Sequence, residues 1–189
     1  MAIELKGISK SFAGTPVLEN ISFTVPDTGI FGIFGPSGSG KTTLLRIITG
    51  LEKADAGEIN GNTGLKFSYV FQEDRLLPSC TVLKNIAVVS DENEALKQLR
   101  AVHLEDAADK YPYELSGGMS RRAALARAFA YGGDVLILDE PFKGLEAELR
   151  DEIAALVKDF ARTKPVILVT HDEGEKQLAC GYYELRAEQ

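Results

Sequence analysis

The sequence predicts an α/β fold with a mostly parallel sheet, an antiparallel N-terminal β subdomain and a short inserted helical subdomain. Short, almost wholly apolar segments alternate with segments of helical periodicity, which is typical of parallel strands covered by helices on both faces. The first segments instead alternate apolar and polar residues, as antiparallel strands with one solvated face do. The length of 189 residues, with 44% apolar and 26% charged residues, suits one soluble domain over residues 1–189.

The N-terminal third supplies the first three elements. Alternation over residues 3–25 predicts antiparallel strands joined by a turn around Gly14. Residues 30–34 are apolar on both faces and predict a buried strand. A helix should begin at about Lys41 and end near Gly50, because apolar residues recur there at helical spacing. The expected core face of this helix consists of Leu44, Ile47, Ile48 and Leu51.

The rest of the chain continues the alternation of strand and helix. Residues 65–71 predict a strand, and the mostly helical pattern over about 73–131 predicts the inserted subdomain. Apolar runs at 135–138 and 166–169 predict two further buried strands. Between them, an apolar stripe over residues 149–160 predicts an amphipathic helix.

Charge and apolar patterning limit the class of partner. Lys plus Arg number 21 and Asp plus Glu number 28, so the net charge is −7. We expect no nucleic-acid partner, because wrapping a phosphate backbone needs a broad basic face. The longest apolar runs fall far short of the roughly 20 residues that span a bilayer. The protein should therefore be soluble when isolated and reach a membrane only through a partner.

A glycine-rich loop follows the first buried strand. Residues 35–42 read GPSGSGKT and fit the pattern GxxxxGK[ST] at every fixed position. Glycines let backbone N–H groups approach a polyphosphate, and the following helix adds its N-terminal dipole. Lys41 should supply charge to the β- and γ-phosphates, and Thr42 a hydroxyl to Mg²⁺. The candidate nucleotide-binding residues of this loop are Gly35, Pro36, Ser37, Gly38, Ser39, Gly40, Lys41, Thr42 and Thr43.

An acidic pair follows the buried strand at 135–138. Asp139 and Glu140 are costly at that place unless they meet a cation or a polar site. Ligands of open α/β sheets bind at the carboxyl ends of the strands, which is where this pair lies. We expect Asp139 to hold Mg²⁺ and Glu140 to polarise an attacking water. The alternative is a pair of solvated acids that start a turn.

A second candidate anion site is the segment LSGGM at residues 115–119. Ser116 is expected to cap a helix, and Gly117 and Gly118 expose backbone N–H groups at its start. Taken alone, the segment is equally compatible with an ordinary capped helix. The helix that follows carries Arg121, Arg122 and Arg127.

In this order, the glycine-rich loop, the LSGG segment, the strand ending in Asp-Glu and His171 after a further strand resemble the ATP-binding-cassette (ABC) ATPase family. The resemblance covers essentially the whole chain. It implies ATP as substrate, Mg²⁺ as cofactor, and hydrolysis by in-line attack of water on the γ-phosphorus. The catalytic residues that it implies are Lys41, Gln72, Glu140 and His171. The metal ligands that it implies are Thr42, Gln72 and Asp139.

The resemblance also gives roles to single positions. Gln72 matches the family's Q-loop glutamine, which contacts Mg²⁺ and senses the γ-phosphate. Residues 116–118 match the signature, which contacts the γ-phosphate of ATP held by the other subunit. His171 matches the switch histidine. Phe12 falls where the family stacks an aromatic ring on adenine, the alternative being a core position.

Two positions depart from the family pattern. Met119 stands where the signature usually has Gln, and Glu146 stands where the segment after the acidic pair usually has Asp. These departures bear on communication between subunits and on turnover more than on ATP binding.

The resemblance implies two partners: a second copy arranged head to tail, and an integral membrane permease. Residues 70–78, VFQEDRLLP, are similar to the ATP-binding subunits of nitrate, sulfonate and taurine-type importers. Leu76, Leu77 and Pro78 form an apolar tip that should dock the permease, unless the two leucines pack in the local core. The protein would then lie at the cytoplasmic face of the inner or plasma membrane. Two other functions stay open: a soluble ABC ATPase, for example in iron–sulfur assembly or nucleic-acid work, and a non-hydrolysing nucleotide-binding module.

Overall fold

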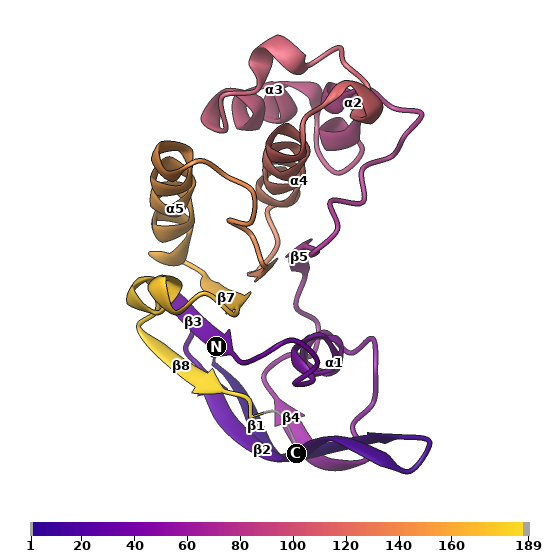
Figure 1. Ribbon diagram of the computed structural model, residues 1–189, viewed down its shortest axis with the longest axis vertical. Helices are drawn as coiled ribbons and strands as arrows, with labels where there is room; N and C mark the ends of the chain where they lie inside the picture. The colour runs from indigo at the N-terminus through magenta and orange to yellow at the C-terminus, as the bar shows by residue number, and fades with distance from the viewer. Residues whose placement is uncertain (1, 187–189) are drawn as a thin grey trace.

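The computed structural model describes residues 2–186 and contains two sheets. An antiparallel sheet has the order β2-β1-β4, formed by Thr15–Val25, Ile3–Phe12 and Ala56–Asn60. A parallel sheet has the order β5-β6-β7-β3-β8, and Figure 1 shows it between the antiparallel sheet and the helices α2, α3 and α4. Its strands are β3 (Gly29–Phe34), β5 (Phe67–Val70), β6 (Val135–Asp139), β7 (Pro165–Thr170) and β8 (Gly181–Glu184).

The described residues form five α-helices and three short 3₁₀ helices. The α-helices are α1 (Lys41–Ile48), α2 (Val82–Ala87), α3 (Glu92–Ala101), α4 (Gly117–Tyr131) and α5 (Ala147–Ala161). The 3₁₀ helices are η1 (Glu105–Ala107), η2 (Pro112–Glu114) and η3 (Glu173–Leu178). Within residues 2–186, none of these helices has the length and hydrophobicity needed to cross a bilayer.

Two apolar cores lie on opposite faces of the parallel sheet. Leu136 and Leu138 of β6 join the core shared with α2–α5, whereas Val135 and Ile137 join the core shared with α1 and the antiparallel sheet. This alternation follows from the two-residue period of a strand. Because both faces are covered, all four residues are fully buried, as the apolar run predicted.

The predicted β-hairpin and most predicted elements are confirmed, and the turn has a clear cause. Ala13 and Gly14 connect β1 to β2, and both have positive φ angles, 50° and 83°. A two-residue turn of this kind matches the right-handed twist of the strands that it joins.

Some expectations about element boundaries are wrong. Leu51 was expected on the core face of α1, but the helix ends at Ile48 and Leu51 is 72% exposed. The helix does end near Gly50, as predicted, with Thr49 as its C-cap, and Leu51 lies beyond that end. The Thr49 side chain donates to the carbonyls of Leu45 and Arg46. The strand expected at 65–71 is shorter. Strands β4 and β8 were not predicted, because residues 56–60 hold no apolar run and residues 181–184 hold only two tyrosines.

Candidate functional site

The glycine-rich loop joins the end of β3 to the start of α1. Gly38 and Gly40 have φ angles of 81° and 88°, a conformation that side chains disfavour. A Cβ on Gly40 would also lie 2.8 Å from the Val17 carbonyl oxygen. The turn therefore needs glycine at these places. The N-terminus of α1 follows the loop directly, so its free N–H groups are available to an anion that the loop binds.

Lys41 folds back over this loop. Its Nζ donates to the carbonyls of Gly35 and Pro36, both at 2.7 Å. Burial lowers the pKa of Lys41, and the charges of Glu140 and Asp139 partly oppose this. Nearby, the buried Ser39 hydroxyl has no hydrogen-bond partner among the described residues. The loop thus offers a cation, an unused hydroxyl and a helix N-terminus, which together suit a phosphate group.

The acidic pair lies at the carboxyl end of β6. Asp139 is 5% exposed, and burial, followed by the charge of Glu140, raises its pKa to about 6. Lys41 and Arg121 counter this rise only in part. Glu140 has a φ angle of 52°, which is unusual for a residue with a side chain, and its N–H donates to the Val169 carbonyl at 2.8 Å. Strained backbone of this kind gathers at functional sites, where the surrounding structure holds it in place.

Glu140 and His171 form a direct pair. His171 Nδ1 lies 2.7 Å from Glu140 Oε1, and the Thr170 hydroxyl donates to Glu140 Oε2 at 3.3 Å. The Thr170 hydroxyl also accepts the Asp172 N–H at 3.0 Å. One hydroxyl therefore contacts both Glu140, which pairs with His171, and Asp172, which follows His171 in the chain. Arg150 of α5 then holds Asp172 and the buried Glu175, at 3.1 and 3.3 Å. The structure thus brings Glu140 and His171, which the sequence predicts separately as catalytic residues, into direct contact.

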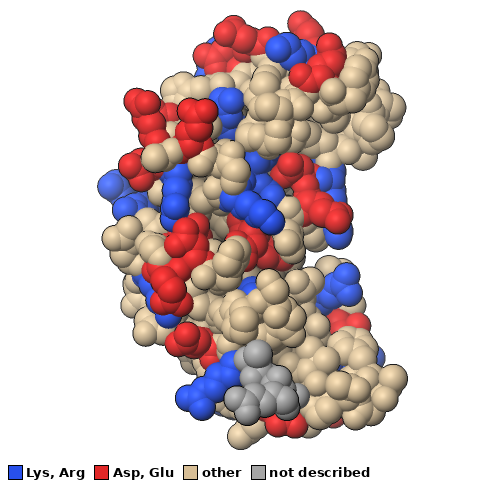
Figure 2. Space-filling view, viewed as in Figure 1, with Lys and Arg blue, Asp and Glu red and all other residues tan. Residues whose placement is uncertain are grey.

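A cleft of about 870 Å³ brings several predicted residues together. Figure 2 shows a hollow at the right of the molecule whose rims carry both acidic and basic side chains. The predicted site residues that line this cleft are Thr42, Gln72, Gly117, Gly118 and Asp139. Of the other predicted residues, Lys41 begins α1 next to Thr42, Glu140 directly follows Asp139 at the end of β6, and His171 directly follows β7.

The start of α4 has the predicted cap. Ser116 Oγ accepts the Met119 N–H at 3.3 Å, and Ser116 and Gly117 are exposed. The start of this helix therefore lies at the surface beside the cleft rather than in the core. Met119 packs partly against the core, and Glu146 precedes α5 without capping it through its side chain.

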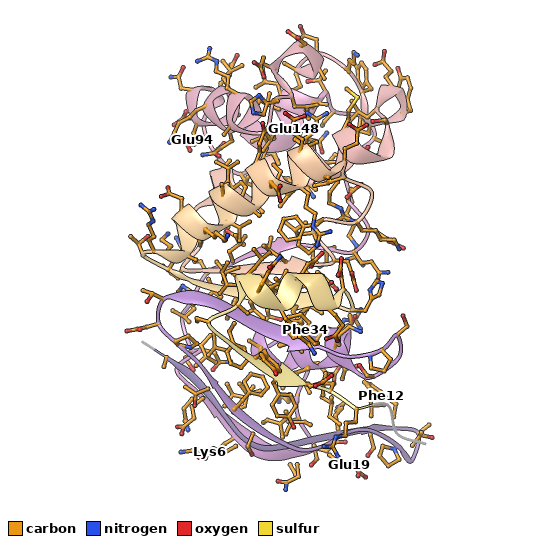
Figure 3. All side chains as sticks on the ribbon, turned by 60° about the vertical axis from the view of Figure 1, so that its left-hand side comes forward. Lys6, Phe12, Glu19, Phe34, Glu94 and Glu148 are labelled. Carbon is orange, nitrogen blue, oxygen red and sulfur yellow. The ribbon has the colours of Figure 1, made fainter. Side chains whose placement is uncertain are left out.

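Phe12 is exposed rather than part of the core. This residue is 46% exposed at the end of β1, and Figure 3 shows it beside the β-hairpin. The Lys10 ammonium lies 5.2 Å from the ring centroid and is held by Glu52 and Asp55. The core alternative for Phe12 is therefore excluded, and a flat aromatic surface remains available.

The predicted apolar tip divides into two parts. Leu76 packs against the core, as the alternative expected, whereas Leu77 is 41% exposed and Pro78 is exposed. The fully buried Asn85 of α2 fixes this loop: its Oδ1 accepts the Leu77 N–H at 2.7 Å, and its Nδ2 donates to the Leu77 carbonyl at 3.1 Å. Sequence reasoning missed Asn85, and its only signal was a polar residue on an otherwise apolar helix face.

The residues proposed for Mg²⁺ fit that ion. Asp139 offers a buried carboxylate, Thr42 a hydroxyl and Gln72 an amide, and all three line one cleft. The described part of the chain holds no cluster of three or more His, Cys, Asp or Glu side chains suited to a metal. A sparse set of oxygen donors is what Mg²⁺ uses when water and substrate phosphates complete its shell.

Comparison with known proteins decides the family. Residues 18–143 match the family model described as ABC transporter. The chain belongs to the ABC transporter family. It is an ABC-type ATPase that binds and hydrolyses ATP. Its glycine-rich loop, LSGG segment and acidic pair are thus elements of an ATP-binding cassette.

Individual relatives agree with this assignment. The chain is 43% identical to the aliphatic sulfonates import ATP-binding protein SsuB 1 of Nocardia farcinica, an alignment that covers 93% of this chain and 74% of the relative. It is 38% identical to the sulfate/thiosulfate import ATP-binding protein CysA of Escherichia coli, over 93% of this chain and 54% of the relative. A dimeric ATP-binding cassette bound to ADP and phosphate superposes with a TM-score of 0.89, at 28% identity, over 99% of this chain and 97% of that one.

Proposed function

We propose that this ABC ATPase drives a membrane importer through a separate permease, with Glu140 and His171 as its catalytic pair. The observation that carries the catalytic assignment is the 2.7 Å contact between these side chains, beside the glycine-rich loop. The transport assignment is supported by relatives that are named as import ATP-binding proteins. They do not favour the alternative of a soluble ATPase without a transport role.

Hydrolysis would depend mainly on positioning and on charge neutralisation. Lys41, released from the two loop carbonyls, would move its ammonium onto the β- and γ-phosphate oxygens. Glu140 would accept a hydrogen bond from the attacking water and align it with the γ-phosphorus. His171, which holds Glu140 through Nδ1, would present its other ring nitrogen to the phosphate.

Metal and adenine contacts complete the proposed site. Thr42, Gln72 and Asp139 would hold Mg²⁺, which when bound neutralises charge on the phosphate oxygens. An ion in this place would also relieve the burial cost of the Asp139 carboxylate. Phe12 would stack on the adenine ring through its exposed face.

We further propose that two copies face each other head to tail. The N–H groups at Ser116–Gly118, at the capped start of α4, would then reach the γ-phosphate of ATP held by the loop of the second copy. A dimeric relative with ADP and phosphate bound supports this arrangement. ATP would close the pair, and loss of the γ-phosphate would release it.

The permease would meet the exposed part of the apolar tip. Leu77 and Pro78 are exposed and are held in place by Asn85, so they form a preordered contact. The protein would then sit at the cytoplasmic face of the membrane as a peripheral subunit. In this scheme residues 1–189 act as one ATPase domain, and the insertion at about 73–131 carries both the tip and the signature.

The experiment that tests the catalytic assignment is Glu140→Gln. The variant should bind ATP and accumulate as a closed dimer, while hydrolysis falls by at least about 10²-fold, the scale for a lost preorganised polar group. Phosphate release and size-exclusion chromatography with ATP measure the two effects. Turnover at the wild-type rate would remove Glu140 from the mechanism, whereas loss of ATP binding would point to a folding defect.

A further inference from the structure

One buried arginine on α4 grips the main chain around Gln72. Arg121 is 5% exposed, and its two terminal nitrogens donate to two consecutive carbonyls. Nη1 lies 2.6 Å from the Phe71 oxygen, and Nη2 lies 2.5 Å from the Gln72 oxygen. A guanidinium offers donors in a fixed planar fork, so two contacts from one group define both the position and the orientation of this peptide.

The hydrogen bonds of Arg121 connect the start of α4 to Gln72, and both have roles in the proposed mechanism. Arg121 lies in the second turn of α4, whose first residues are the exposed Gly117 and the half-buried Gly118. Gln72 lines the same cleft as Thr42 and Asp139. Within the part of the chain that is described, Arg121 thus joins the helix start that would face the second copy to the residue that would contact Mg²⁺.

Charge supports a fixed rather than a loose contact. Asp74 Oδ1 lies 3.2 Å from Arg121 Nη1, and its side chain is 23% exposed. A carboxyl group therefore lies beside the buried guanidinium, which makes burial of this cation less costly than burial of a lone one. The Phe71 ring also stacks on the ring of Tyr69, with the two centroids 4.1 Å apart.

We propose that Arg121 is a positioning residue for Gln72: its fork holds the Phe71–Gln72 carbonyls so that the Gln72 side chain stays at the cleft, and it makes Gln72 and the start of α4 move together. This inference rests on the proposed role of Gln72. It predicts that Arg121 acts on turnover through Gln72 and not through the stability of the helix.

The test is a double-mutant cycle on ATP hydrolysis. Arg121→Met keeps the length of the side chain but removes the fork, and it should lower kcat by at least about 10-fold, since small misplacements of catalytic groups are costly. Gln72→Ala should also lower kcat. If Arg121 works through Gln72, the double variant is no slower than Gln72→Ala alone. The Mg²⁺ concentration needed to bind a nonhydrolysable ATP analogue, measured by calorimetry, should rise in both single variants.

Arg127 provides a matched control on the same helix. It also donates to two main-chain carbonyls, those of Asp74 and Arg75, both at 3.0 Å. Arg127→Met removes a similar contact just beyond Gln72, so it should leave kcat and the Mg²⁺ dependence within about 2-fold of wild type. Arg121→Lys, which keeps one cationic donor, should recover part of the lost kcat.

Two outcomes would overturn the positioning role of Arg121, and they differ from the outcome that would remove Gln72 from the proposed ATPase site. Multiplied losses in the double variant, or an equal loss in Arg127→Met, would show that Arg121 only supports the fold. A Gln72→Ala variant with wild-type kcat would instead remove Gln72 from the proposed site, and the positioning role with it. If Arg121→Met does not fold by circular dichroism, Arg121→Gln, which retains an amide donor, takes its place in the same cycle.

Discussion

Single charges in this site are held where water is scarce. Lys41 is partly buried and rests on the carbonyls of Gly35 and Pro36, while Asp139 and Glu140 end a strand that is otherwise wholly apolar. Burial raises the free energy of each of these charged groups, and a bound nucleotide with its cation would offset that increase. The attraction between these buried groups and a bound nucleotide with its cation is therefore stronger than it would be between the same charges in water.

Removing the ammonium of Lys41 should weaken ATP binding. Lys41→Ala deletes one charge-assisted contact, which contributes about 1.5–3 kcal/mol, so affinity should fall by about 10- to 100-fold. Isothermal calorimetry with ATP at fixed Mg²⁺ measures this. Arg162→Ala is the control, because Arg162 is an exposed cation at the far end of α5. Equal affinity in the two variants would contradict the phosphate role of Lys41.

Glu175 makes stability depend on pH. Burial raises the pKa of its carboxyl above the ordinary 4.5, although the Thr170 hydroxyl and Arg150 oppose this. The unfolded chain thus loses this proton at a lower pH than the folded protein does, so ionisation costs folding stability as pH rises through that interval. Glu175→Gln cannot ionise. Its free energy of unfolding, relative to wild type, should therefore increase from pH 4.5 to pH 8, as urea denaturation at both values would measure. A constant difference would show that Glu175 ionises normally.

At the scale of elements, the sequence predicts what local periodicity encodes and misses what distant contacts decide. The buried strands and the capped start of α4 are confirmed because apolar runs and Ser116 act locally. Strand β8 pairs with β3, which lies about 150 residues earlier in the chain, and no local sequence pattern predicts that pairing. Arg121 and Asn85 were equally hidden, since their partners are main-chain carbonyls and amides whose positions only the fold reveals.

The loop before α2 should depend on one buried amide. Besides its two contacts with Leu77, Asn85 Nδ2 donates to the carbonyls of Cys80 and Thr81, both at 3.0 Å. Asn85→Ala leaves several of these groups without partners, so the free energy of unfolding should fall by about 2–3 kcal/mol. Denaturant unfolding measures this loss. Asn62→Ala removes a single donation to Ile48 at the other end of the molecule and should cost less. A loss no larger than that of Asn62→Ala would mean that the loop is not held by Asn85.

At the scale of the whole molecule, the candidate site is open. Figure 1 shows the antiparallel sheet and α1 at one end, and α2 and α3 at the other, with α4 between them and the parallel sheet. The glycine-rich loop leads into α1 in the first part. Ser116 caps the start of α4, which follows α2 and α3 in the chain and leads to β6. Within one copy, Thr42 of the glycine-rich loop and Gly117 and Gly118 at the start of α4 border the same open cleft. In the proposed head-to-tail pair, each loop would instead face the helix start of the other copy.

A mixing experiment tests that pairing directly. Lys41→Ala impairs the cradle, and Ser116→Glu places a negative charge at the helix start, so neither variant alone forms a complete site. In a mixed pair, the intact cradle of one copy meets the intact helix start of the other, and one of the two sites is restored. Equal mixing should therefore recover about a quarter of wild-type ATPase activity if pairing is random and the sites are independent. Phosphate release from the mixture, set against each variant alone at the same total concentration, measures the recovery. If the mixture is no more active than the average of its components, each copy must complete its own site and the head-to-tail arrangement fails.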